Sequence, residues 1–359
     1  MYKLKCLNCL LGGAIGDALG APVEFLPLDE IIEKFGPQGL TDYAPSYHRL
    51  GAITDDTQMT LFTANGLLSS YVQKDLKDFV SIARTTKLAY KHWLYTQEHP
   101  YSQDLPAGIN LKGPLSNAAD LYHRRAPGRT CISALKSDSS LTSNDSAIND
   151  RKGCGGVMRI APVGLLVTIY DAFQTGVEIA AITHGHPSGQ LPAGVLAAVI
   201  RYLYEGLELP KALNQAITRL KTYKAHEETL NALNLAIKLA CDRSVTPIKA
   251  ISLIGQGWVA EEALAISIYC ALNAKDFRQG VLMAVNHDGD SDSTGAIAGN
   301  VLGLIYGLDS APSNWLENLE LREVISELAE DLCDAPNWKI NAQLAQPYPD
   351  DDLAWRKYL

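Results

Sequence analysis

Apolar residues along this chain recur mainly at three- and four-residue steps, the spacing of helices that bury one face. The spacing is clear near the start of the chain, at Leu4, Leu7, Leu11 and Ile15. Similar sets follow positions 59, 195, 230 and 263, whereas the alternating runs typical of strands are nearly absent. The pattern therefore predicts an all-α fold.

No internal repeat and no linker divides this helical pattern, so we expect a single compact multi-helix domain over residues 1–359. Two stretches depart from it. Residues 97–152 are rich in Pro, Gly, Ser, Asp and Asn, and we expect an irregular insertion there, because long loops in compact domains are commonly functional. Residues 334–359 are rich in Pro and Asp and are expected to form a surface tail.

Glycines recur at helical spacing in two parts of the chain: Gly12, Gly16 and Gly20, and then Gly295, Gly299 and Gly303. A glycine inside a helix lowers its stability by up to about 1 kcal/mol relative to alanine. Because these glycines lower helix stability, we predict that they are present to allow packed helices to approach closely at the centre of the fold.

Composition narrows the class of protein. The chain is 47% hydrophobic and 20% charged, as expected of a globular domain. Its formal net charge of −9 argues against nonspecific nucleic-acid binding, which requires a basic face. Seven scattered cysteines, an odd number, favour reduced thiols in the cytoplasm. We expect no membrane-spanning segment, because no apolar run is long enough.

The most distinctive polar stretch, NHDGDSDSTGAIAGN, spans Asn286–Asn300. Two carboxylates, Asp290 and Asp292, are followed by the hydroxyls of Ser293 and Thr294, which is more than one helix cap requires. Oxygen ligands of this kind suit hard cations such as magnesium, manganese or calcium. An EF-hand is excluded because the twelfth position is Val301. A phosphatase motif remains a minor alternative, although the helical pattern that follows does not suit that fold.

A second acidic stretch, GAITDDTQ, contains Thr54, Asp55 and Asp56 and also precedes a helical pattern. If the two stretches meet, their buried carboxylates repel one another unless cations neutralise them. Two divalent ions about 3.5–4 Å apart would do so. The sequence thus predicts a central binuclear site. The alternative is two exposed and unrelated helix starts.

Three further stretches contain candidate residues. Glu24, between Val23 and Phe25, follows a glycine-rich helix and is a candidate general base or gate. Gly155 and Gly156 precede an apolar helix, where backbone NH groups suit a phosphate or sugar oxygen, although a tight turn explains them equally well. His184 in ITHGHP lacks the partners of a zinc site, and we expect a neutral hydrogen-bonding residue beside a ligand.

In this order the motifs resemble the ADP-ribosylglycohydrolase family, which includes the dinitrogenase-reductase-activating glycohydrolase and ADP-ribosylarginine hydrolases. The similar stretches are GGAIGDALGAPVEF, GAITDDTQMTL, RRAPGRT, GCGGVMRIAP, ITHGHP, GWVAEEALAISIYCAL and HDGDSDSTGAIAGN. They extend over residues 12–300. Any one of them is weak, but the ordered set is highly specific.

The resemblance implies an all-helical fold around two magnesium or manganese ions. It places the ion ligands on Thr54, Asp55, Asp56, Asp290, Asp292 and Ser293. Many members have Thr at the last position, and Ser keeps the hydroxyl. It places the catalytic carboxylates on Glu24, Asp55 and Asp56. The substrate contacts fall on Gly155, Gly156, Val157, Met158, Arg159 and His184. Trp258 borders either the adenine or the core.

The function implied is metal-dependent hydrolysis of the N-glycosidic bond between ADP-ribose and a modified protein side chain, arginine first among them. Such an enzyme reverses mono-ADP-ribosylation, and its counterpart is an ADP-ribosyltransferase toxin or a regulatory enzyme. The first alternative is a two-metal hydrolase of free nucleotides or small ADP-ribose conjugates. The second is a protein that binds ADP-ribose or a partner without catalysis, which the complete set of oxygen donors argues against.

Overall fold

The computed structural model describes residues 2–74, 81–102, 104–106, 109, 113–137, 146–340 and 354–359, and every regular element in them is helical. The all-α prediction is confirmed. The α-helices are α1 (Tyr2–Gly20), α2 (Leu28–Phe35), α3 (Asp55–Gln73), α4 (Ile82–Glu98), α5 (Arg129–Ser137), α6 (Ala161–Leu166), α7 (Ile169–Ala181), α8 (Pro187–Tyr204), α9 (Leu209–Leu220), α10 (Glu227–Cys241), α11 (Pro247–Ile254), α12 (Ala260–Asn273), α13 (Phe277–Val285), α14 (Ser291–Tyr306), α15 (Ser313–Asn318) and α16 (Arg322–Asp334). The short 3-10 helices are η1 (Gly113–Asn117), η2 (Ala119–Tyr122), η3 (Cys154–Gly156), η4 (Ala335–Asn337) and η6 (Ala354–Tyr358).

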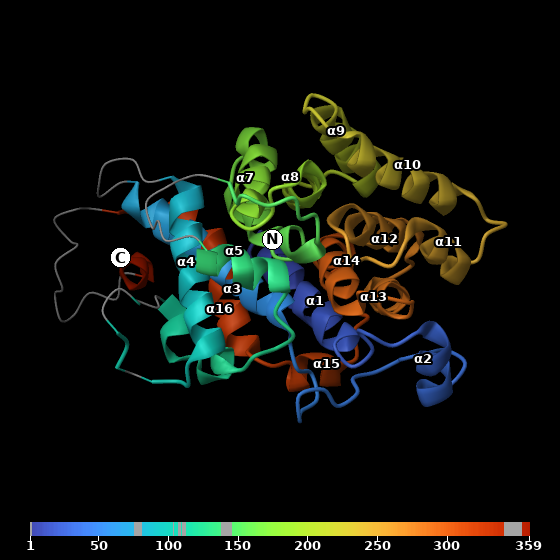
Figure 1. Ribbon diagram of the computed structural model, residues 1–359, viewed down its shortest axis with the longest axis horizontal. Helices are drawn as coiled ribbons and strands as arrows, with labels where there is room; N and C mark the ends of the chain where they lie inside the picture. Colours follow the sequence, from blue (N-terminus) through green and yellow to red (C-terminus); the bar gives the residue numbers. More distant parts are fainter. Residues whose placement is uncertain are drawn as a thin grey trace.

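Helices α1 and α14 form the central pair of the fold, although they lie near opposite ends of the chain (Figure 1). Their backbones touch through the two glycine rows. A Cβ atom at Gly16 would lie 1.9 Å from the carbonyl oxygen of Gly295, and one at Gly299 would lie 2.1 Å from that of Gly12. Because no side chain fits in this contact, the glycines are a packing requirement, as the sequence predicts.

The remaining helices surround this pair and share one hydrophobic core with it. Helices α3, α13 and α16 pack against α1, and α12, α13 and α8 pack against α14. Helices α9, α10 and α11 lie together on one side of the molecule, at the upper right of Figure 1. In the described residues, no helix combines the length and apolar character needed to cross a membrane.

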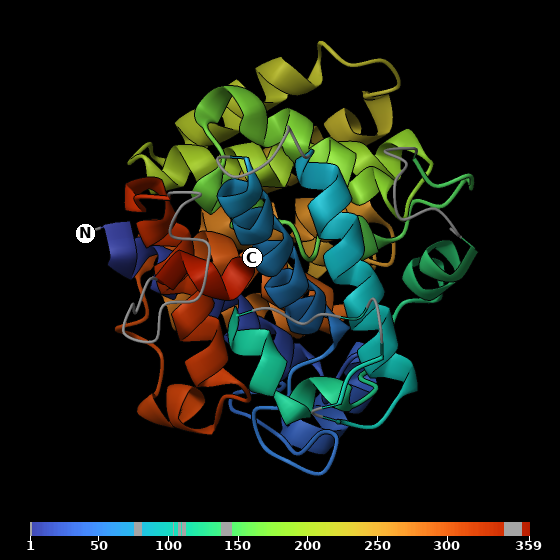
Figure 2. The same cartoon turned by 90° about the vertical axis from the view of Figure 1, so that its left-hand side faces the viewer.

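The end of the tail, residues 354–359, packs more deeply than the expected surface position, whereas Asp334, Pro336 and Lys339 are exposed. Trp355 is 1% exposed, and Tyr358 is fully buried and donates a hydrogen bond to Asp331. Figure 2 shows the red η6 helix beside α3. Residues 341–353 of the expected tail, and residues 103, 107–108, 110–112 and 138–145 of the expected insertion, lie outside the described residues.

Candidate metal centre

Two of the candidate carboxylates come from the start of α14. Asp290 occupies the N-cap position, where its backbone NH donates to Gln256 O at 2.8 Å. Asp292 lies in the first turn, and its Oδ1 accepts from the backbone NH of Ser293 at 2.9 Å. The side chain of Asp290 does not cap the helix. Both residues are nearly fully buried.

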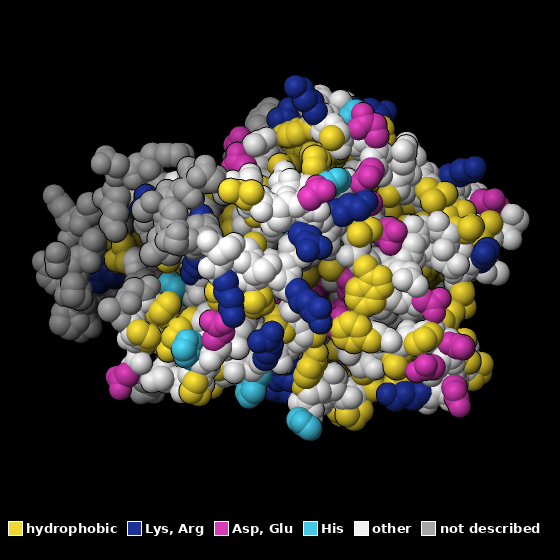
Figure 3. Space-filling model, in the orientation of Figure 1, with side chains coloured by type: hydrophobic (Ala, Val, Ile, Leu, Met, Phe, Trp, Pro, Cys, Tyr) yellow, Lys and Arg dark blue, Asp and Glu magenta, His cyan; other side chains and the backbone are white. Residues whose placement is uncertain are grey.

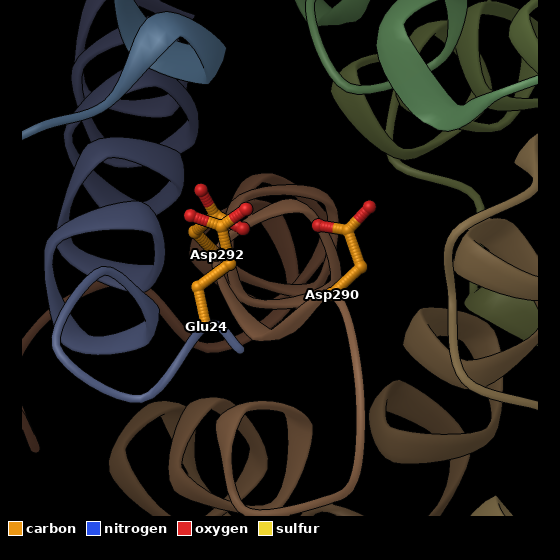
Figure 4. A group of neighbouring side chains, drawn as sticks. All are labelled: Glu24, Asp290 and Asp292. Atoms are coloured by element: carbon orange, nitrogen blue, oxygen red, sulfur yellow. The ribbon is translucent and has the colours of Figure 1, made fainter. Parts of the chain in front are cut away.

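The third carboxylate comes from the turn that follows α1. The NH groups of Val23 and Glu24 both donate to Gly20 O, which folds this turn back over the end of the helix. Glu24, Asp290 and Asp292 each offer an oxygen atom within 4.8 Å of the others. Figure 4 shows these carboxylates gathered at the start of α14, with Glu24 reaching them from the turn. We call these three residues the acidic cluster.

The second acidic stretch forms the N-terminus of α3, where Asp55 and Asp56 are also buried. Asp17, which is fully buried in α1, accepts hydrogen bonds from the backbone NH groups and hydroxyls of Thr54 and Thr57. The sequence suggests only a local hydrogen-bonding role for Asp17. In the structure Asp17 joins α1 to the start of α3 and thereby fixes where Asp55 and Asp56 point.

The two acidic stretches face one another. Burial raises the pKa of Asp56 well above its ordinary value, and the largest charge contribution in the same direction comes from Asp292. Burial and Asp292 likewise raise the pKa of Asp55. Burial raises the pKa of Glu24 to about 11, with Asp292 and Asp290 adding to the shift. The structure therefore brings together carboxylates that lie far apart in the sequence.

These residues fit a hard divalent cation. Among the described residues, no Lys, Arg or His forms an ion pair with Glu24, Asp55, Asp56, Asp290 or Asp292. Two buried oxygens, Glu24 Oε2 and Asp56 Oδ1, have no hydrogen-bond partner in the part of the chain that the structure describes. A buried carboxylate without a counter-charge is costly, and oxygen donors are the ligands that magnesium and manganese prefer.

A thiol also reaches the acidic cluster. Cys154, in η3, donates from Sγ to Asp290 Oδ2 at 2.8 Å, and Ser293 Oγ lies 3.5 Å from the same sulfur. The sequence alone indicates no role for this residue. No motif distinguishes it from the other scattered cysteines, and only the fold places it against Asp290.

The glycine loop that follows Cys154 is tightly packed. A Cβ at Gly155 would lie 2.7 Å from Cys131 Sγ, and one at Gly156 would lie 2.7 Å from Gly189 O. Val157 is fully buried, and Met158 Sδ lies 3.8 Å from the Ser293 hydroxyl. Packing alone thus requires glycine at both positions. A substrate contact by Gly155, Gly156, Val157 and Met158 stays a prediction.

Arg159 and His184 lie side by side in the interior. Arg159 is fully buried, donates to Thr183 Oγ1 at 2.7 Å and stacks on Tyr90 at 4.2 Å. His184 Nδ1 lies 2.9 Å from the same hydroxyl. Burial and the charge of Arg159 lower the pKa of His184 to about 3, so its ring is neutral. The guanidinium is engaged within the protein, and its part in substrate binding stays a prediction.

Aromatic side chains lie at the rim of the acidic cluster. Phe25 follows Glu24 and stacks on Trp258, which is 37% exposed and is therefore not a core residue. Burial raises the pKa of Tyr47, and the carboxylates of Glu24 and Asp292 raise it further. Tyr47 lies in a stretch without periodicity, so the sequence analysis missed it. Its positive φ of 49° marks a strained position of the kind found at functional sites.

Fold and site together define an all-helical protein that buries an acidic, oxygen-rich site at its central helix pair. The ADP-ribosylglycohydrolase family model matches residues 2–341. The chain belongs to the ADP-ribosylglycohydrolase family, whose enzymes hydrolyse ADP-ribose conjugates. A solved structure described as an ADP-ribosylglycohydrolase-related protein complex has the same fold, with a TM-score of 0.65 and 24% identity over 93% of this chain and 98% of the other.

Curated relatives match nearly the whole chain at low identity. The ADP-ribosyl-[dinitrogen reductase] glycohydrolase of Rhodospirillum rubrum is 26% identical over 89% of this chain and 91% of its own length. The ADP-ribosylarginine hydrolase Tri1 of Serratia proteamaculans is 25% identical over 91% of this chain and 78% of its own. The human ADP-ribosylhydrolase ARH3 is 22% identical over 90% and 92%.

Proposed function

We propose that this protein is a metal-dependent hydrolase that removes ADP-ribose from modified arginine side chains of proteins, and so reverses mono-ADP-ribosylation. The observation that carries the proposal is the group of buried carboxylates without counter-charge, contributed by the turn after α1 and by the starts of α3 and α14. The arginine linkage is supported by the name of the Serratia relative.

Two magnesium or manganese ions are the cofactors we propose, held by Thr54, Asp55, Asp56, Asp290, Asp292 and Ser293. All six are nearly or fully buried and carry an oxygen donor. Bound ions of this kind supply Lewis-acid charge that offsets carboxylate repulsion, polarises substrate oxygens and lowers the pKa of water.

The side chains of the protein would accept the proton of the attacking water and bind the substrate. The charge of the bound ions would lower the raised pKa of Glu24 and leave it ionised. Its Oε2 has no hydrogen-bond partner among the described residues, so in this proposal it accepts a proton from the attacking water. Asp55 and Asp56 lie within the same group of charges and are the other candidate acceptors. In this proposal neutral His184 and the loop from Gly155 to Arg159 bind the ribose and diphosphate. Within that loop Arg159 acts through His184, which it holds in place by way of the Thr183 hydroxyl that both contact.

The proposed reaction and the free cysteines also bear on the location and the partners of the protein. All seven cysteines are free thiols, which supports a cytoplasmic location. The substrate is an ADP-ribosylated protein. The enzyme that adds the modification, either a toxin or a regulatory ADP-ribosyltransferase, is the counterpart of this hydrolase.

The test is to identify by mass spectrometry which linkage is cleaved with magnesium present. Arginine-linked protein, serine-linked peptide and free nucleotides are compared as substrates. We expect release from the arginine-linked protein, and loss of that release in Asp55→Ala and Asp290→Ala with the helical fold retained. Glu323→Ala, which alters a carboxylate whose side chain is 83% exposed, is the matched control and keeps full activity. Cleavage of nucleotides alone, or unchanged turnover in both aspartate variants, would contradict the proposal.

A further inference from the structure

An exposed aromatic pair stands beside the acidic cluster. Phe25 and Trp258 are 68% and 37% exposed, with ring centroids 5.6 Å apart and planes within 17° of parallel. Two other stacked pairs rest on the core: Phe173–Tyr223 and Trp338–Tyr358 each contain one ring that is at most 2% exposed. A third, Tyr95–His99, pairs a half-buried ring with an exposed one. Stacking contributes only about 0.5–1.5 kcal/mol beyond burial, so stability alone does not explain two exposed rings.

The backbone ties each ring to the acidic cluster. Phe25 directly follows Glu24 and adopts a φ of 73°, which is unfavourable for an aromatic residue. Trp258 directly follows Gly257, where a Cβ would lie 3.4 Å from Asp290 Cβ. The carbonyl of Trp258 also accepts from the NH of Cys154, whose thiol bonds Asp290. The pair is thereby held at the rim of the cluster from two sides.

Both rings of the pair are exposed at this rim. Figure 3 shows hydrophobic side chains exposed together with Lys and Arg side chains near the middle of one face. Aromatic faces attract planar cations, by about 0.5–2 kcal/mol according to how far the cation is desolvated.

We propose that Phe25 and Trp258 form an aromatic platform that packs against a planar cationic leaving group, the guanidinium of the modified arginine. This inference deepens the proposed function and rests on it for the identity of the leaving group. The platform makes Phe25 and Trp258 specificity-determining residues, because a neutral leaving group such as a serine hydroxyl gains nothing from it.

Binding of methylguanidinium and of its neutral isostere methylurea tests the platform without turnover. Ligand-observed NMR on protein saturated with magnesium and ADP-ribose compares the two. We expect wild type to prefer methylguanidinium, and Phe25→Leu and Trp258→Leu to bind it about 5- to 30-fold more weakly, which corresponds to about 1–2 kcal/mol. Trp258→Phe, which keeps an aromatic ring at this position, is expected to retain most of the wild-type affinity for methylguanidinium. Equal binding of the two probes by wild type, or unchanged affinity in both leucine variants, overturns the platform.

A matched control separates the effect of the platform from the general effect of removing an exposed aromatic ring. Tyr2 is 49% exposed and contacts Tyr204 near the other end of α1, with ring centroids 5.1 Å apart and planes tilted by 43°. Tyr2→Leu therefore removes an exposed aromatic ring far from the site. We expect it to leave probe binding unchanged, and an equal loss there counts against the platform. The two proposals fail separately. A preference for methylguanidinium without cleavage of arginine-linked protein contradicts only the proposed reaction, and cleavage without that preference contradicts only the platform.

Discussion

The contact between Gly20 and Asp292 offers the sharpest test of how the fold builds the site. Gly20→Ala would place a Cβ 2.3 Å from Asp292 Cα and 2.4 Å from Asp292 N and Ser291 O. Ordinary contact begins at 3.4 Å, so the two backbones must separate by 3.4 − 2.3 = 1.1 Å at this point, and all three atoms belong to backbone. A shift of about 1 Å at a reacting centre costs on the order of 100-fold in rate.

Gly303→Ala is the matched control. Its Cβ would lie 2.0 Å from Asn8 O, an equally severe backbone contact between the same two helices. Gly303 follows Asp292 by eleven residues, which is about 16 Å along the helix axis. Overpacking costs about 1–3 kcal/mol in either variant, offset in both by up to about 1 kcal/mol of helix propensity.

We therefore expect similar losses of stability and very different losses of function. Urea unfolding gives the stability of each variant. Turnover at saturating magnesium, and the rise in Tm on adding magnesium, report on the site. The reasoning is refuted if Gly20→Ala keeps turnover within about 3-fold of Gly303→Ala at equal stability, because Asp292 would then not depend on the helix contact.

Two further predictions concern stability. His184 has a pKa of about 3 in the folded protein against 6.5 ordinarily, so its contribution is present above pH 6.5 and is lost as pH falls toward 3. Between pH 7 and 4.5 wild type should therefore lose about 2.5 kcal/mol more of its unfolding free energy in urea than His184→Gln does, and parallel curves would contradict this. Glu320 is 1% exposed and accepts from Arg125 at 2.9 Å and from the NH of Ile53 at 3.0 Å. Because Glu320→Ala leaves Arg125 buried and unpaired, it should destabilise the protein by about 3–5 kcal/mol in the same assay, whereas a loss below about 1 kcal/mol would show that the pair is dispensable.

Periodicity and glycine spacing predict much of the fold, because both follow from local geometry. The rows at Gly12–Gly20 and Gly295–Gly303 indicate helices that approach their neighbours closely, and the structure shows that α1 and α14 approach each other. The oxygen-rich stretches at Thr54–Asp56 and Asp290–Ser293 indicate where charge accumulates. Their assembly into one site depends on that helix contact, which charge pattern alone does not reveal.

Several residues whose roles are not apparent from their sequence neighbours act through distant partners. Asp17 bonds to residues 37 and 40 positions later, so its neighbours in α1 carry no sign of that role. Cys154 meets Asp290 across 136 positions. Trp355 and Tyr358 follow a stretch rich in Pro and Asp, and their burial depends on α3 and α16, which local composition cannot encode.

The pairing of α1 with α14 also governs when this molecule can acquire its shape during synthesis. Gly20 leaves the ribosome 291 − 20 = 271 residues before Ser291, which at 5–20 residues per second is a delay of roughly 15–55 s. Throughout that interval the glycine-lined face of α1 has no partner. Nascent chains are thus expected to need shielding by a chaperone, and an early stop before α14 yields no enzyme at all.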